Sequence, residues 1–126
     1  YETAERLLGA NEECAGVAYF YACYRAVMAA FYNDERLNSD AAARAVRPKL
    51  SAGSRHVDFH SGHPSRGPGV NDVVRFLYPS IQPKYELLHI RSVVVRYAGG
   101  ITGGTVAESQ ALAQAVIEFL RGADVL

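Results

Sequence analysis

Residues 14–32 read CAGVAYFYACYRAVMAAFY and are long enough for about five turns of helix. At 100° per residue, the large side chains fall within a sector of about 140°, and the alanines lie on the opposite side. A helix of this kind buries its bulky side in a core and lets another backbone approach its alanine side, within a bundle or across a dimer. The bulky set is Val17, Phe20, Tyr21, Tyr24, Val27, Met28, Phe31 and Tyr32, and the small set is Ala18, Ala22, Ala26, Ala29 and Ala30.

The same stretch raises the question of a membrane span. It has no Leu or Ile, and Arg25 near its middle would cost about 2.5–3.5 kcal/mol at the centre of a bilayer. Cys14 and Cys23 lie about 180° apart around such a helix, so they are not expected to form a disulfide with each other. The sequence therefore predicts a soluble protein of a reducing compartment, the cytoplasm, with no membrane contact.

The composition fits one globular domain over residues 1–126, since 49% of the residues are hydrophobic and 21% are charged. The net charge is zero, but it is unevenly distributed: residues 44–96 carry nine bases and three acids, whereas residues 1–43 carry seven acids and three bases. A basic middle segment is typical of a phosphate-bearing ligand or of an acidic neighbour, such as the chain's own N-terminal segment.

The rest of the chain predicts further helices. Ser39 is a candidate N-cap for a helix from Asp40 toward Val46, and Thr105 begins a capping box with Glu108 for the last helix. The remaining expected helices cover residues 1–9, ending at Gly9; residues 71–78; and residues 80–97, with Pro83 in the first turn and Gly99 and Gly100 as the cap. Together these segments predict an all-α bundle of four to six helices.

An alternative for residues 87–97 is a β-strand, because Val93, Val94 and Val95 are good strand formers. A strand followed by GGITGGT (residues 99–105) would imitate a phosphate-binding β-loop-α unit, with the phosphate on the amides of residues 103–106. Such folds need several strands, and no convincing second strand is present. A helix is therefore favoured.

As a helix, residues 84–97 place one cation in an unusual position. Arg91 lies within an apolar stripe, where it must extend its charged end to solvent, pair with a carboxylate such as Asp72 or Glu12, or meet an anionic ligand or a partner chain. The apolar stripe is formed by Leu87, Leu88, Val94 and Val95, and a separate polar stripe by Tyr85, His89, Ser92 and Arg96. A structural salt bridge and an anion site both remain open.

The order of these segments resembles that of HEPN domains. The resemblance rests on AYFYACYRAVMAAFY, on a basic middle that contains histidines, and on LLHIRSVVVRYAGGIT followed by AESQALAQAVIEFL. HEPN domains are small all-α proteins of toxin–antitoxin and antiviral systems; they dimerise, and many cleave RNA without a metal through an Arg, a polar residue and a His about five positions after the Arg. The resemblance thus implies a homodimer, an RNA or nucleotide ligand and a cognate antitoxin, and it places the motif on Arg91 and Ser92.

This chain departs from the motif at its last position. The His falls on Arg96, with Tyr97 beside it, and a guanidinium cannot act as a general base in a protein. His89 shares the polar stripe with Arg96 and is the candidate replacement. The resemblance therefore implies either an RNA- or nucleotide-binding domain that does not cut, or a metal-independent ribonuclease with a composite site of Arg91, Ser92, Arg96, Tyr97 and His89.

Residues 51–69 form a loop rich in Gly, Ser and Pro that holds three of the four histidines. Loops of this length are usually functional or mobile. A local helix would direct His56, His60 and His63 to one side, where they would bind a transition metal, although Gly62 and Pro64 disfavour that helix. The other interpretations are solvated histidines, or RNA contacts by Arg55, His56, His60 and Arg66.

Two function classes follow, the first from the resemblance and the second from the alanine side of the helix over residues 14–32. The first is a HEPN-like nucleic-acid- or nucleotide-binding module of a toxin–antitoxin or defence system, for which no cofactor is expected. The second is a noncatalytic domain that dimerises or binds a protein through its alanine side. Metal binding by His56, His60 and His63 is a further alternative. The basic run of Arg44, Arg47 and Lys49 is either a solvated helix face or an additional RNA contact.

Overall fold

The computed structural model describes the backbone of residues 12–97 and 106–126, and the side chains of residues 16–93 and 107–126. Over these residues the fold is all-α and contains no strand, so the predicted helical bundle is confirmed. The elements are α2 (Glu12–Asn33), η1 (Glu35–Leu37), α3 (Asp40–Val46), η2 (Ala52–His56), α4 (Val70–Leu77), α5 (Gln82–Tyr97) and α6 (Val106–Gly122), where η marks a 3₁₀ helix.

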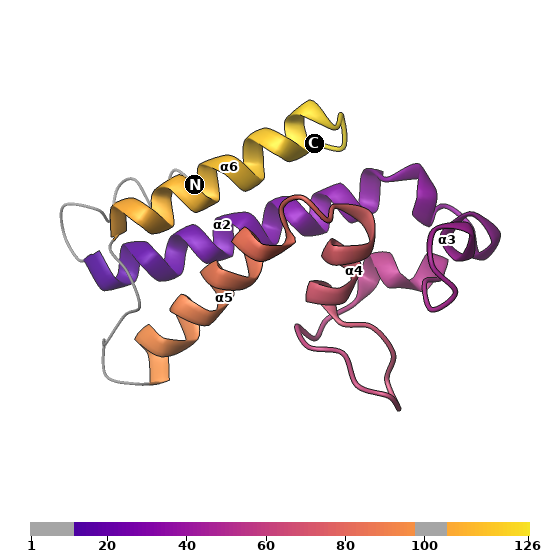
Figure 1. Ribbon diagram of the computed structural model, residues 1–126, viewed down its shortest axis with the longest axis horizontal. Coiled ribbons are helices and arrows are strands. Elements are labelled where there is room, and N and C mark those ends of the chain that lie inside the picture. Colours follow the sequence, from indigo (N-terminus) through magenta and orange to yellow (C-terminus); the bar gives the residue numbers. More distant parts are fainter. Residues whose placement is uncertain (1–11, 98–105) are drawn as a thin grey trace.

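The long helix α2 organises the bundle. It runs side by side with α6 in the same direction, while α5 crosses it in the reverse direction and also contacts α6 (Figure 1). The short helices gather near the C-terminal half of α2, where η2 packs against it (Figure 1). A single core joins both parts, because buried side chains of α2 contact those of the short helices as well as those of α5 and α6.

The buried side of α2 differs from the predicted one. Phe20, Val27 and Phe31 are buried as expected, but Tyr21 and Tyr32 are 42% and 67% exposed. Because α5 and α6 pack on two sides of α2, its core sector is rotated toward the alanines, and the core also takes in Tyr19, Cys23 and Ala30. The free alanine side expected for a dimer is therefore partly used within the chain, where Ala18 and Ala26 also pack against the core.

The faces of α5 are likewise not those predicted. Tyr85 and Ser92, expected on a polar stripe, are buried, whereas Leu87, expected on the apolar stripe, is 39% exposed. Leu88 is buried as predicted. The segment is helical through Tyr97, so the strand alternative for residues 87–97 is wrong.

The N-cap at Ser39 is where the sequence predicts, unlike the buried faces of α2 and α5. Ser39 caps α3, and its hydroxyl accepts a hydrogen bond from the amide of Ala42 at 3.1 Å. The loop of residues 51–69 is more ordered than its composition suggested, because it contains η2 and a tight turn. In that turn the amide of His63 donates to the carbonyl of Gly67 at 3.0 Å and the amide of Gly67 donates back at 2.7 Å.

Within the described residues, no helix is both long and apolar enough to cross a membrane. Cys23 is buried, and its thiol lies 3.7 Å from the carbonyl oxygen of Ala113. Burial raises the pKa of this thiol to about 12, so it stays protonated and unreactive at neutral pH. Several predictions lie outside the described residues: the helix over residues 1–9, the cap at Gly99 and Gly100, the phosphate loop of residues 103–106, the Thr105 cap and the side chain of Cys14.

Candidate functional site

Arg91 is held between two helices. Its side chain is only 12% exposed, and its Nη2 donates to Glu108 of α6 at 2.9 Å. The salt bridge expected for Arg91 therefore exists, with Glu108 in place of Asp72 or Glu12. Nε and Nη1 of Arg91 are buried and find no acceptor among the described residues. Each buried N–H group without a partner costs about 1–3 kcal/mol.

The other described members of the predicted composite site lie differently. The hydroxyl of Ser92 is buried and donates to the carbonyl of His89 at 2.9 Å, one turn earlier in the same helix. His89 points toward α2, where its ring stacks on Phe20 with centroids 5.1 Å apart. Arg96 and Tyr97 are helical in backbone, but their side chains lie outside the described residues. The described contacts thus place Arg91 against α6 and His89 against α2.

Two histidines from distant segments meet on the core of the bundle. The rings of His60, from the 51–69 loop, and His89, from α5, have centroids 4.4 Å apart. The ring of Phe20 stacks on His89 and lies tilted against His60, with centroids 5.7 Å apart, and Tyr24 contacts His60 edge-on at 5.3 Å. The sequence named both histidines but assigned them to different sites, because only the folded chain brings the loop back onto α5.

The remaining predicted RNA contacts are split between structural and exposed roles. Arg55 is partly buried and donates to the carbonyl of Asp34 at 3.2 Å and to the side chain of Asn38 at 2.8 Å, so it ties η2 to the end of α2. His56 is exposed at the end of η2. Arg66 is exposed, and its guanidinium lies 4.6 Å from the ring centroid of Phe59.

The metal alternative is not supported by the loop conformation. The 3₁₀ helix ends at His56, so the local helix that would align His56, His60 and His63 is absent. In the part of the chain that the structure describes, no three His, Cys, Asp or Glu side chains come together as a metal site would require. Nδ1 of His63 instead accepts a hydrogen bond from the amide of Ser65 at 3.1 Å.

A basic and aromatic cluster forms where the α3–η2 connection meets α4. The guanidinium carbons of Arg47 and Arg75 lie 5.7 and 5.5 Å from the ring centroid of Phe76. Lys49 is exposed nearby and makes no ion pair with the described residues. The sequence identified Arg47 and Lys49 as part of a basic run, but it gave no sign that Arg75 and Phe76 would join them.

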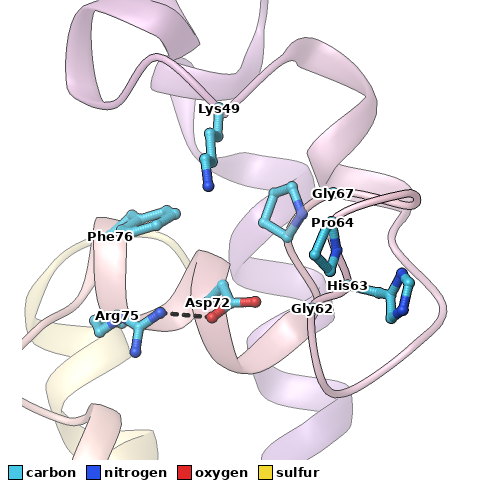
Figure 2. Close-up of a pocket in the computed structure, with 9 residues that line it drawn as sticks. Lys49, Gly62, His63, Pro64, Gly67, Asp72, Arg75 and Phe76 are labelled. Carbon is cyan, nitrogen blue, oxygen red and sulfur yellow. Dashed lines mark hydrogen bonds and ion pairs between the residues drawn. The ribbon is translucent and has the colours of Figure 1, made fainter.

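A pocket of about 520 Å³ opens beside this cluster. It is lined by Lys49, Gly62, His63, Pro64, Gly67, Pro68, Asp72, Arg75 and Phe76. Figure 2 shows the ammonium group of Lys49 directed into the space between Phe76 and Pro64, with Arg75 and Asp72 at the opposite side. The imidazole of His63 points away from this space in the same view.

The chain was compared with protein-family models, with curated proteins and with solved structures, and none of them matches it.

Proposed function

We propose that this chain is a nucleic-acid-binding helical domain that contacts RNA through the basic and aromatic cluster of Arg47, Lys49, Arg75 and Phe76. The single observation that carries the proposal is the placement of two guanidinium groups over one aromatic ring, next to a lysine without an ion-pair partner among the described residues. Cations bind the phosphate backbone, and guanidinium planes and aromatic rings stack on unpaired bases. Single-stranded RNA offers both features.

The HEPN-like character of the domain is part of the same proposal. The all-helical fold agrees with the resemblance, which supplies the toxin–antitoxin or defence context, the cognate antitoxin and the homodimer as expectations. We propose binding without cleavage, because Arg91 already pairs with Glu108 and the hydroxyl of Ser92 already donates to the backbone. Arg96 at the position of the motif His has no basic atom to accept a proton.

Replacing Arg47 with alanine is expected to weaken binding of a single-stranded RNA 12-mer by about 5- to 10-fold, because it removes one phosphate contact and one stacking plane. The slope of log K against log salt should become less steep by about 0.7, the share of one phosphate contact on a single strand. Fluorescence anisotropy at several salt concentrations measures both quantities. Arg121→Ala is the matched control, since Arg121 is exposed on α6.

Two results would contradict this assignment. Equal affinity of the wild type and the Arg47→Ala variant would remove the cluster from the interface. Cleavage of the RNA in the presence of EDTA, lost in both Arg91→Ala and His89→Ala, would establish the ribonuclease alternative at the composite site. Intact RNA with salt-sensitive binding is the result that we expect.

A second function, association with a protein, is favoured by the outer face of α5. Leu87, Ile90 and Val93 are 39%, 51% and 36% exposed and follow one another at three-residue spacing, opposite the buried Leu88 and Ser92. A helix that is apolar on both faces is usually buried on both. We therefore propose that the expected homodimer forms through this stripe, in place of the alanine side of α2.

The Ile90→Asp variant is expected to weaken self-association by about 30-fold or more, because a charge at the centre of an apolar contact removes at least about 2 kcal/mol of binding energy. Sedimentation equilibrium between 1 and 200 µM measures the change. Gln114→Asp, on the exposed side of α6, is the control and should behave as the wild type. A wild type that remains monomeric at the highest concentration would end the proposal.

A further inference from the structure

The pocket beside the basic cluster has a fixed wall. The carboxylate of Asp72 accepts a hydrogen bond from the amide of Gly69 at 3.0 Å and binds the guanidinium of Arg75. Gly62 lies directly against the same carboxylate, and a Cβ there would also lie 3.2 Å from the carbonyl oxygen of Gly67. The 62–69 turn is thus bonded to α4 at Gly69 and packs against Asp72 at Gly62, so the pocket exists before any ligand arrives.

Some charged groups of the pocket have an ion-pair partner among the described residues and others do not. One guanidinium nitrogen of Arg75 forms an ion pair with the carboxylate of Asp72, so these two charges largely offset each other. Lys49 has no ion-pair partner among the described residues, and its ammonium group is directed into the pocket (Figure 2). Arg47 adds a second uncompensated positive charge across Phe76. The pocket lining itself therefore presents one uncompensated positive charge, that of Lys49, and Arg47 adds a second one outside the lining.

The remaining walls are apolar. Phe76 lies on one side and Pro64 on the other (Figure 2), and Pro68 also lines the pocket. A volume of about 520 Å³ falls in the range of pockets that enclose a small organic ligand and is far more than a bare phosphate needs. The flat ring and the prolines suit a ribose and a base, and the ammonium group suits a phosphate.

We infer that this pocket binds a nucleotide through its terminal phosphate, either a free nucleoside monophosphate or the phosphorylated end of an RNA strand. The inference rests on the proposed nucleic-acid binding and adds a preference for a phosphomonoester. A monoester carries a charge of about −1.5 to −2 at pH 7, against −1 for each diester inside a strand. It thus interacts more strongly than an internal phosphate with the uncompensated ammonium group of Lys49 in the pocket and with the nearby Arg47.

The test compares three forms of one RNA 8-mer, with a 5′-phosphate, with a 3′-phosphate and with hydroxyl groups at both ends, together with AMP and inorganic phosphate. Calorimetry or anisotropy at pH 7.5 should show that one phosphorylated end improves affinity by about 10-fold over the hydroxyl-ended strand. Lys49→Ala should abolish this preference: it should weaken hydroxyl-ended RNA by about 5-fold, as expected for one lost phosphate contact, and the phosphorylated strand by about 50-fold. Lys49→Arg should restore most of it, and unchanged thermal melting should show that both variants are folded.

The outcomes separate the inference from the proposed function. Binding of all three strands with equal affinity overturns the phosphate pocket but keeps the RNA-binding domain. Binding of AMP that depends on Lys49, without binding of any strand, supports the pocket for a free nucleotide and overturns the RNA-binding proposal. Inorganic phosphate that competes as well as AMP would show that the apolar walls contribute nothing, and a preference that persists in Lys49→Ala would place the phosphate elsewhere.

Discussion

Replacing Asp34 with alanine is expected to lower the free energy of unfolding by about 3 kcal/mol, close to the lower end of the range for breaking a buried charge pair. Asp34 is 4% exposed and joins three parts of the chain. Its carboxylate accepts hydrogen bonds from the backbone and side chain of Arg36 at 2.8–3.0 Å and from the hydroxyl of Tyr78 at 2.9 Å. The side chain of Arg36 is 44% exposed, so water can solvate its guanidinium when Asp34 is removed. This limits the loss of unfolding free energy.

The contribution of Asp34 to the free energy of unfolding depends on pH, because its carboxylate can be protonated. Burial acts to raise the pKa of Asp34, but the hydrogen bonds from Arg36 and Tyr78 outweigh it and hold the pKa below its ordinary value of 3.8. Since the folded state binds the proton less readily than the unfolded state, the stabilisation is complete above pH 3.8 and is lost as the pH falls below it. The stability curves of the wild type and of Asp34→Ala should therefore converge in acid.

Urea unfolding followed by circular dichroism between pH 2.5 and 7 measures both effects. Tyr78→Phe removes only one donor and should cost about 1 kcal/mol, and Glu35→Ala, at an exposed neighbour, should cost less than about 0.5 kcal/mol. A constant difference between the wild type and Asp34→Ala across this pH range would show that the network does not depend on the charge of Asp34.

Replacing Gly69 with alanine is expected to cost about 2–3 kcal/mol, because the new methyl group meets backbone atoms. A Cβ at this position would lie 2.5 Å from the carbonyl oxygen of His60 and 2.7 Å from the carbonyl carbon of Ser61. The backbone of Gly69 has a φ of −87°, which alanine also adopts, so the effect would be purely steric. The loop must shift away from α4, and the amides of Val70 and Asn71 would lose their acceptors, the carbonyls of Phe59 and His60.

Denaturant unfolding gives the size of this effect, and amide hydrogen exchange at Val70 and Asn71 gives its location. Gly53→Ala is the matched control, because the nearest atom to its Cβ would be the hydroxyl oxygen of Ser51 at an ordinary 3.5 Å. A Gly69→Ala protein within about 0.5 kcal/mol of the wild type would mean that the loop is not seated on α4 as described.

The helices themselves were predictable from sequence, but the surfaces they bury were not. Ser39 and the α3 boundaries follow from local capping chemistry, and the α2 and α5 segments follow from composition and length. The orientation of α5 depends on packing, because its apolar residues surround much of the helix and periodicity alone does not say which of them meet α2. Tyr85 therefore turns into the core, while Ile90 remains outside.

The candidate site was predictable only in pieces, for the same physical reason. Arg47 and Lys49 were recognisable as a basic run, but Phe76 and Arg75 come from a different helix and join them only after the loop has folded. Arg91 was identified as a cation that needs a partner, and the partner turned out to be Glu108, across the α5–α6 contact. The HEPN resemblance, the RNA ligand and the homodimer stay predictions.

The parallel pairing of α2 with α6 has a consequence for how the chain is made. Cys23 meets Ala113, and Asn33 meets the carbonyl of Val125, across separations of 90 and 92 residues. Contacts this distant in sequence form late, since the closure of a long loop must precede them. During synthesis on the ribosome, the apolar side of α2 therefore stays partly exposed until α6 has been made. During that interval the nascent chain is most open to chaperones and to aggregation.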